Sequence, residues 1–491
     1  MKKIITLLIL PLTLLVADFT LVGNILTPNT PDTSNTQTIN NELSTISNTN
    51  KYLEQVNLPT CDIDNPEVQF IRNNTDWNTI NSTTKRIFCV SPGNYTSLRN
   101  IKITTSGTSE NRRYIILDNG NDTHPGKLDK TQLANFALLF DGASYWTIDR
   151  GATVNRDDFN YILENGSSHN IFNRILQINY SVAFHIKHGC HYNTIQNSRF
   201  DTMTQQGFKY DLSSIQIQGS GSPLTVLGTK IINNEFVNAK PGRLNRYVGQ
   251  ICDFTGTIFD SNNVEYTDDL RTDCHGNLNP NGNCLAGESS GFSAKYGSLD
   301  PNKPVIFSNN HVWGFLPTDP TMEPTLSGQG IGFIAYVGAS YIHIKNNVIF
   351  NGSQGISIAD RYDKSHGTEY AEITGNLIVN CGALPYSNDS SSINISQAYH
   401  ATVKNNTIIN PIGHYAKIWY NYAGVYYGQN IVVNPDTSII TSPNNATVTG
   451  LGTDTIYPSA NDGGFINNYT FTTDKFTNKP RIITLENVLK P

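Results

Sequence analysis

The sequence predicts an all-β, single-stranded parallel β-helix, which is a β-solenoid with a cap at each end. An asparagine recurs three residues before an apolar residue and after a short alternating run, at irregular intervals of about 24 to 37 residues with one longer gap. Repeats of this length are typical of stacked arrays. The alternation has a period of two, which indicates strands and not helices. The repeated asparagines are Asn197, Asn234, Asn310, Asn347, Asn376, Asn406 and Asn430.

Asparagine suits the turn between two strands of such a coil for two reasons. Its backbone tolerates the left-handed conformation, and stacked asparagine side chains can hydrogen-bond to one another along the array. A solenoid also explains how 491 residues could form one domain, because each coil contacts only its neighbours.

The N-terminal residues are typical of a secretory signal followed by a linker. Lys2 and Lys3 precede an apolar run over residues 4–16, and Ala17 is a small residue suited to cleavage, so residues 1–17 form the expected signal peptide. The apolar run is too short to span a membrane comfortably. We therefore expect a secreted, periplasmic or cell-surface protein without membrane insertion after cleavage. Residues 18–60 are rich in Asn, Thr and Ser, which is the composition of a linker.

The coils are expected between residues 61 and 435. Residues 255–290 form an insertion that is too long for a tight turn and contains acidic residues, glycines and two cysteines. Long loops on a rigid scaffold commonly carry function. Residues 436–491 lose the asparagine signal, and we expect them to cap the last open coil.

Charge and cysteine content narrow the classes of partner. The net charge of −6 and the lack of a basic stripe argue against binding to nucleic acid. The seven cysteines are an odd number for an exported chain. Cys61 could pair with Cys89, and Cys274 with Cys284. The remaining three, Cys190, Cys252 and Cys381, leave at least one buried thiol. The sequence does not predict the oligomeric state.

A five-residue strand recurs with a small residue first and apolar or small residues at its second and fourth positions. Because side chains alternate along a strand, the third and fifth positions face outward. The aligned strands are Ala137–Asp141, Asn160–Glu164, Ala183–Lys187, Ser214–Gln218, Gly291–Lys295, Gly332–Tyr336, Gly355–Ala359 and Ser392–Ser396. One coil near residue 252 has no clear match to this pattern.

The outward positions combine both signs of charge, amides and an aromatic ring. Carboxylates and amides can bind sugar hydroxyls and an aromatic ring can cover a sugar face, so we expect this strip to bind a polysaccharide. The alternative for each residue is an ordinary exposed strand position, with Glu164 and Lys187 as a simple cross-strand ion pair. The expected substrate-binding residues are Asp141, Glu164, His185, Gln216, Gln218, Tyr336 and Asp360.

The chain resembles the right-handed parallel β-helix proteins of the pectate-lyase-like superfamily over about residues 62 to 435. The resemblance lies in VSPGNYTSLRNIKITTSGTSENRRYIIL, the NN turns and GFSAKYGSLDPNKPVIFSNNHVWGF. It implies a right-handed coil and a secreted polysaccharide lyase or glycoside hydrolase. GFSAK is similar to a pectate-lyase strand of the type DGFAxK, with Lys295 at the lysine and Ser290 at the acidic position. AFHIKHG is similar to the RHG strand of alginate and chondroitin lyases, with Lys187 at the arginine position.

If the protein is a lyase, it removes the C5 proton of a uronic acid and expels the group on O4. The neighbouring carboxylate must be neutralised by donors or a cation, and a base must take the proton. Lys295 is the first candidate for the base, and Arg361 could reach the same region. Lys187 is the second, although Glu164 beside it makes it better suited to binding a substrate carboxylate. The complete polygalacturonase pattern of NTD, DD, GHG and RIK is absent, because the sequence contains neither GHG nor RIK.

Calcium is the candidate cofactor, with its site in the insertion. Asn277, Asn279, Asn281, Gly282 and Glu288 fall at positions 1, 3, 5, 6 and 12 of an EF-hand-like loop. Asp268 and Asp269 are alternative oxygen ligands. The loop has few charges, and a chance match in an Asn-rich segment is the competing interpretation.

Two other functions stay open on the sequence alone. The chain could be a non-catalytic β-helix that binds glycans or another surface, or a glycoside hydrolase on the same fold. Lys295, Arg361 and the loop acids gathered around one groove would favour an enzyme. A flat polar face with those residues dispersed would favour a binding protein.

Overall fold

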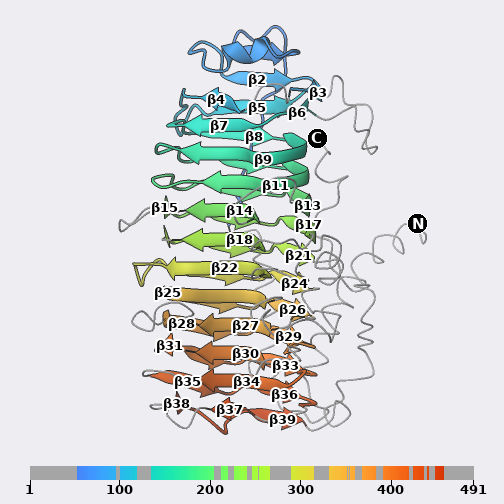
Figure 1. Ribbon diagram of the computed structural model, residues 1–491. Helices are drawn as coiled ribbons and strands as arrows, with labels where there is room; N and C mark the ends of the chain where they lie inside the picture. The colour runs from blue at the N-terminus through green and yellow to red at the C-terminus, as the bar shows by residue number, and fades with distance from the viewer. Residues whose placement is uncertain are drawn as a thin grey trace, which may run out of the picture.

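The strands of this protein pair in parallel from one coil to the next, as β11 does with β9 and β14. The computed structural model describes residues 52–95, 100–118, 134–203, 212–218, 226–239, 246–252, 254–265, 289–313, 331–350, 352, 354–359, 368–382, 391–396, 398–419, 424–435, 439–441 and 448–457. In these residues the structure is nearly all β-strand, with a short 3-10 helix η1 (Asp76–Thr79) near the N-terminal end. The predicted fold class is confirmed. The coils form a right-handed parallel β-helix that runs from top to bottom in Figure 1.

Three stacks of strands form the walls, and each coil passes from stack B to stack C to stack A. Three long strands turn a corner and belong to two stacks: β9 (Ala152–Glu164) and β11 (Leu176–Ile186) to C and A, and β25 (Ile331–Lys345) to A and B. The other strands of stack A, whose labels run down the middle of Figure 1, are β4 (Ile101–Ile103), β7 (Leu138–Asp141), β14 (Leu212–Gln218), β18 (Arg246–Cys252), β22 (Ser289–Gly297), β27 (Gln354–Ala359), β30 (Ser391–Ser396), β34 (His414–Trp419) and β37 (Ile440–Thr441).

The other strands of stack B are β1 (Val68–Ile71), β2 (Ile87–Val90), β5 (Arg113–Leu117), β8 (Trp146–Asp149), β10 (Ile171–Asn173), β12 (Thr194–Gln196), β16 (Lys230–Ile232), β20 (Ile258–Asp260), β23 (Val305–Ser308), β28 (Thr368–Thr374), β32 (Thr402–Lys404), β35 (Val425–Gly428) and β38 (Val448–Thr449). Those of stack C are β3 (Gly93–Asn94), β6 (Ala134–Asn135), β13 (Arg199–Met203), β17 (Glu235–Ala239), β21 (Asn263–Glu265), β24 (His311–Trp313), β26 (Val348–Phe350), β29 (Leu377–Val379), β33 (Thr407–Ile409), β36 (Ile431–Val433) and β39 (Thr455–Tyr457). Short pairs extend the corners: β31 (Ala398–Tyr399) joins β28, and β15 (Val226–Leu227) joins β19 (Phe254–Thr255).

The inward positions of all three walls form one continuous apolar core. Aromatic rings stack inside it from coil to coil, with 4.6 Å between the ring centroids of Phe200 and Phe236 and 5.2 Å between those of Phe292 and Phe333. Such pairs add to the stabilisation that comes from burying their area. At the N-terminal end, the buried Trp77 of η1 packs against Phe136, with 5.2 Å between the centroids. The core therefore runs the length of the helix along its axis.

In the turns from stack B to stack C, two neighbouring residues share the two roles expected of one asparagine, which are the left-handed backbone and the hydrogen-bonded stacking. The first residue takes the left-handed conformation, with φ of 53° at Asn346 and 56° at Asn405. The second is buried in a hydrogen-bonded ladder: Asn406 Nδ2 donates to Asn430 Oδ1 at 3.0 Å, and Asn406 Oδ1 accepts the Asn376 backbone N–H at 3.0 Å. The ladder runs through Asn234, Asn262, Asn310, Asn347, Asn376, Asn406 and Asn430, and it ends on Asp454.

Two positions of the predicted repeat need correction. Asn197 has a φ of 52° and is therefore the left-handed first residue of its turn. Ser198 occupies the ladder position, where its N–H donates to Asn234 Oδ1 at 2.9 Å. The longer gap in the repeat contains a complete turn, because Asn262 bonds to Asn310 as a regular member of the ladder. Strands β20 and β21 on either side of this turn lie inside the segment expected to be an insertion. Past the expected end of the coils at residue 435, β37, β38 and β39 continue all three stacks.

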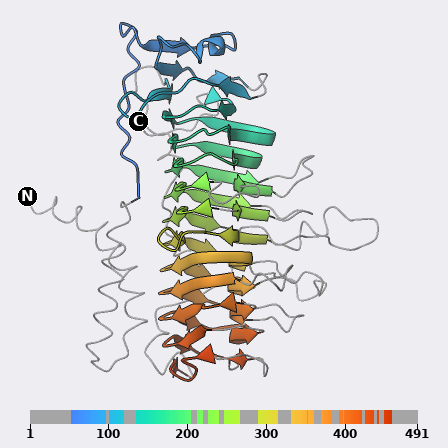
Figure 2. The same ribbon diagram turned by 90° about the vertical axis from the view of Figure 1, so that its left-hand side faces the viewer.

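The segment that follows residue 51 lies along the outer face of stack B, although residues up to 60 are expected to be linker. Glu54 contacts both β12 and β16: its N–H donates to Gln196 Oε1 at 2.9 Å, and its carboxylate lies 2.6 Å from Lys230 Nζ. Figure 2 shows this segment, which we call the strap, as a blue trace running up beside the coils. The strap ends at Cys61, whose disulfide bond to Cys89 on β2 confirms the first predicted pair.

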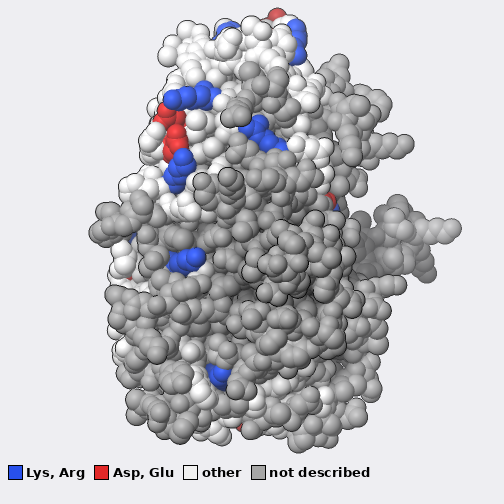
Figure 3. Space-filling view, in the orientation of Figure 1, with Lys and Arg blue, Asp and Glu red and all other residues white. Residues whose placement is uncertain are grey.

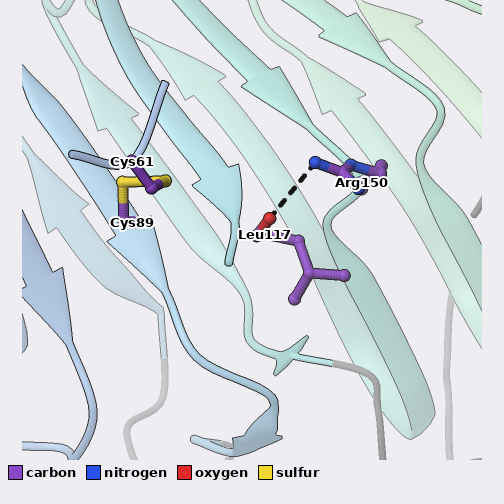
Figure 4. The surroundings of a disulfide bond; sticks show 4 residues. All are labelled: Cys61, Cys89, Leu117 and Arg150. Atoms are coloured by element: carbon purple, nitrogen blue, oxygen red, sulfur yellow. Dashed lines mark hydrogen bonds between the residues drawn. A yellow bond between two sulfur atoms is a disulfide. The ribbon is translucent and has the colours of Figure 1, made fainter. Parts of the chain in front are cut away.

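Figure 4 shows this disulfide bond near the N-terminal end, with Arg150 donating to the Leu117 carbonyl at 3.2 Å close by. Cys190 and Cys381 are free thiols that are buried, as predicted for the unpaired cysteines. The predicted pair of Cys274 and Cys284 lies outside the described residues, as does the expected signal peptide. Within the part of the chain described here, no helix has the length and apolar character needed to cross a membrane.

Candidate functional site on the face of stack A

The strand pairs of stack A bring the aligned outward positions into two straight rows. The third-position row contains Leu139, Ile162, His185, Gln216, Gln250, Ser293, Ile334, Ser357, Asn394 and Lys417. In the fifth-position row, Asp141 pairs with Glu164, and Gln218, Cys252, Lys295 and Tyr336 follow one another. The predicted register is thus correct for the aligned strands, and β18 is the coil that had no match.

The charged side chains gather at the N-terminal end of this face, where Figure 3 shows blue and red groups in one line. Lys102 Nζ lies 2.6 Å from Asp141 Oδ2, and Lys187 Nζ lies 2.6 Å from Glu164 Oε2. Asn165 Nδ2 donates to Asp141 Oδ1 at 2.5 Å. The Asn165 hydrogen bond and the Lys102 ammonium hold the pKa of Asp141 below its usual value. Asp141 therefore stays ionised at neutral pH and cannot act as a general acid.

His185 is held by its neighbours and buried. Its ring stacks on Phe159 with 4.6 Å between centroids, and its Nε2 lies 3.0 Å from Gln218 Oε1. Because an amide oxygen only accepts, Nε2 carries the proton in this arrangement. Burial lowers the pKa of His185 to about 4, so the ring is neutral at pH 7. Its Nδ1 is buried and has no hydrogen-bond partner.

Tyr336 and Gln216 face outward as predicted, but neither is an open sugar platform. Tyr336 is 1% exposed, because it packs with Ile331 and Ile334 in an apolar cluster outside the main core. Gln216 is 5% exposed. The expectation of exposed sugar-binding side chains at these two positions is corrected, since alternation fixes the direction of a side chain but not whether other segments cover it.

Lys295, the first catalytic candidate, lies over the ring of the next coil. Its Nζ is 5.0 Å from the ring centroid of Tyr336, which is a cation–π arrangement. Ser293 on the same strand is buried, and its hydroxyl has no hydrogen-bond partner. Ser290, at the position where the resembling family has an acid, is also buried.

A second lysine has the same arrangement near the C-terminal end of the face, and the sequence reasoning missed it. Lys417 Nζ lies 4.9 Å from the ring centroid of Trp419 on the same strand, β34. The signal was available in YAKIW, which follows the order of the aligned strands from its second position on, with Tyr415 in place of the small first residue. The face of stack A therefore has two lysines that are each held over an aromatic ring.

Several predicted site residues lie outside the described residues: Arg361, Asp360, Asn277, Asn279, Asn281, Glu288, Asp268 and Asp269. The predicted calcium site and the second cation near Lys295 stay predictions. In the described ranges, which omit residues 266–288 and 360–367, no group of three or more His, Cys, Asp or Glu side chains is placed to hold a metal ion.

In sequence, no family model matches the chain, and no curated protein matches it. Solved structures with a similar chain path include a PL6-family polysaccharide lyase from Pseudopedobacter saltans, at 12% identity and a TM-score of 0.44 over 79% of this chain and 92% of the other. The PL6-family alginate lyase AlyGC is 11% identical, with a TM-score of 0.45 over 76% of this chain and 53% of the other. PfbA, a surface adhesin of Streptococcus pneumoniae, is 9% identical, with a TM-score of 0.43 over 74% and 85%. Lyases and an adhesin thus occur among similar coils, and fold alone does not imply function.

Proposed function

We propose that the outer face of stack A binds a uronic-acid-containing polysaccharide outside the cytoplasm. The observation that carries this proposal is Lys295, which is half-buried and held over the ring of Tyr336, whereas Lys417 over Trp419 is only 5% exposed. An ammonium fixed in this way is a preorganised partner for a carboxylate, and Lys295 lies on the same straight face as the more exposed Lys102 and Lys187, along which an extended chain can run. The Cys61–Cys89 disulfide supports the compartment, because such bonds persist in oxidising surroundings.

Cleavage by β-elimination is the second candidate, and the lowered pKa of Asp141 removes one acid that hydrolysis could use. A glycosidase needs one protonated carboxylic acid, usually with a raised pKa. Asp141 is the acid paired in register with Glu164, and its pKa is lowered. Elimination needs instead a cation for the substrate carboxylate and a base for the C5 proton.

In this proposal Lys295 first releases its ammonium proton to the solvent, and its neutral amine then takes the C5 proton. The electrons of that C–H bond form the C4–C5 double bond as the C4–O4 bond breaks, and the leaving oxygen gains a proton from water. Lys187 is tied to Glu164 at 2.6 Å, so it serves better to position a substrate carboxylate than to act as the base. Calcium bound by the insertion would neutralise the substrate carboxylate further, and calcium dependence therefore belongs in the same test.

The test combines cleavage and binding on pectate, alginate, chondroitin and heparan, with and without calcium. Cleavage is followed by the ultraviolet absorbance of the unsaturated product, and binding by calorimetry. We expect Lys295→Ala to lose cleavage and to bind more weakly, and Lys295→Arg to keep binding but lose cleavage, because arginine retains its charge and cannot act as a base. Lys303→Ala, an exposed lysine outside stack A, is the matched control.

Each outcome separates the candidates. Cleavage that survives in Lys295→Arg would show that Lys295 binds substrate and is not the base. Binding without product in every variant would leave the binding proposal and remove the lyase. If no acidic polymer binds to the wild-type protein, the proposed function is wrong.

A further inference from the structure

Three aromatic residues in successive coils form a stack on the outside of the helix, at the corner where stack A leads into stack B. Tyr341 and Tyr370 lie face to face with 5.0 Å between centroids and 2° between planes, and Tyr370 and His400 follow at 4.9 Å and 13°. These spacings match the distance of about 4.8 Å between neighbouring strands. We call these three residues the corner stack.

The corner stack requires an unfavourable backbone. Tyr341, Tyr370 and His400 have φ values of 51°, 55° and 51°, in the left-handed region that bulky side chains rarely adopt. The next coil has Gly424 directly below His400, with a φ of 66°. The turn itself is therefore compatible with glycine, and the strained aromatic residues are not needed to form it. Strain of this kind, retained on a surface, is a reason to look for a function.

The surroundings of the corner stack are polar and accessible. Tyr370 is 42% exposed, and His400 is also exposed. Beside them on stack B, Lys345 Nζ lies 2.8 Å from Glu372 Oε2, and His343 Nε2 lies 3.5 Å from the same oxygen. Because the rings cover one another's faces, their edges and polar atoms meet the solvent, at even spacing along the axis.

A related aromatic stack lies in the N-terminal half of the helix, and an arginine holds it to the body of the protein. Tyr145, His169 and Tyr192 stack at 4.7 and 5.1 Å. Arg112 lies 6.0 Å from the Tyr145 ring centroid and donates to the His169 carbonyl at 2.6 Å, so this upper stack is tied to the body of the protein. Among the described residues, the corner stack has no comparable contact with an arginine.

We propose that the corner stack, with Lys345 and Glu372, is a second carbohydrate-binding surface, separate from the face of stack A. A row of hydroxyl and imidazole groups at even spacing can exchange hydrogen bonds with the repeating hydroxyls of a glycan chain lying along the axis. A protein partner would need a broad patch with an apolar centre. Within the corner stack, Tyr370 is the exposed large hydrophobic side chain, so the surface is narrow. This inference goes beyond the proposed function, because it concerns another wall of the helix.

The experiment replaces Tyr370 and His400 together by glycine, the residue that the chain itself uses at position 424. Binding is measured by affinity electrophoresis in gels containing pectate, alginate or xylan, and thermal unfolding is measured in parallel. We expect the Tyr370→Gly, His400→Gly protein to unfold at the same temperature or higher, and to bind at least one polymer roughly tenfold more weakly. Ile63→Gly, which truncates an exposed residue at the N-terminal end, is the control and should bind as wild type.

The Lys295→Ala protein distinguishes the two surfaces. Polymer binding that persists in Lys295→Ala and is lost in the double glycine variant supports the inference. Binding that is lost in Lys295→Ala and unchanged in the double glycine variant overturns it and leaves the proposed function standing. A lack of binding to all three polymers by the wild-type protein also overturns it, as does a loss of binding that only accompanies unfolding.

Discussion

Asn406 offers a direct test of the buried ladder, because its neighbour Asn405 provides a control within the same turn. Asn406 Oδ1 accepts from the N–H and the Nδ2 of Asn376 at 3.0 and 2.9 Å. Its own Nδ2 donates to the Ile373 carbonyl and to Asn430 Oδ1, both at 3.0 Å. Alanine removes all of these bonds and leaves the Asn376 N–H buried without an acceptor.

The expected cost follows from these contacts. A net hydrogen bond contributes about 0.5–1.5 kcal/mol, and an unsatisfied buried group costs about 1–3 kcal/mol. We therefore expect Asn406→Ala to lower the free energy of unfolding by roughly 3–5 kcal/mol. Asn405 is exposed, with a φ of 56°, and Gly375 occupies the same place one coil earlier. Asn405→Gly should accordingly change stability by less than about 1 kcal/mol.

The assay is urea unfolding followed by tryptophan fluorescence, with hydrogen exchange at β29, β33 and β36 to locate the effect. Because coils contact only their neighbours, the loss of protection should be greatest in these three strands. If the two variants lose equal stability, or if Asn406→Ala loses less than about 1 kcal/mol, the ladder does not stabilise the fold in the way its geometry indicates.

Two further predictions concern the ends of the helix. Burial raises the pKa of Asp454, so the protein loses stability as the pH rises and this carboxyl group becomes charged. Asp454→Asn can still accept the hydrogen bond from Asn430. The variant should therefore be at least as stable as the wild type at pH 7, and the difference should vanish in acid. Free energies of unfolding across this pH range would check it, and a less stable variant at pH 7 would contradict it. Replacing Cys61 and Cys89 by alanine opens a loop with a sequence separation of 28 and should cost about 3–4 kcal/mol, measured by denaturant unfolding; an unchanged midpoint would contradict the prediction.

The register of stack A could be predicted because alternation and a small first residue mark most of its strands. The coil at β18 was missed because Gly249 stands where the other strands have an apolar residue, in register with Ile215 and Phe292. The ladder was misplaced at Asn197 because serine, at position 198, serves there in place of asparagine. Local pattern thus gave the direction of side chains wherever the residue types followed the repeat.

Burial on the outer face could not be predicted in the same way. Whether Tyr336 or His185 meets solvent depends on segments distant in sequence, and no local period encodes that. The ion pair of Glu164 and Lys187 was predictable because the two residues are 23 positions apart, one coil, and share a strand position. The pairing of Lys417 with Trp419 needed only the same pattern applied once more.

The strap should influence the order in which the coils of this helix unfold. The chain from Glu54 to Cys61 has seven residue steps of about 3.3 Å each. Their total length matches the height of stack B between β16 and β2, where each coil adds about 4.8 Å. The Glu54 contacts and the disulfide bond add ties across the coils in that interval, whereas those beyond β16 have no such tie among the described residues. A pulling force or a protease acting on opened coils should therefore unzip the C-terminal half first and leave a durable N-terminal fragment.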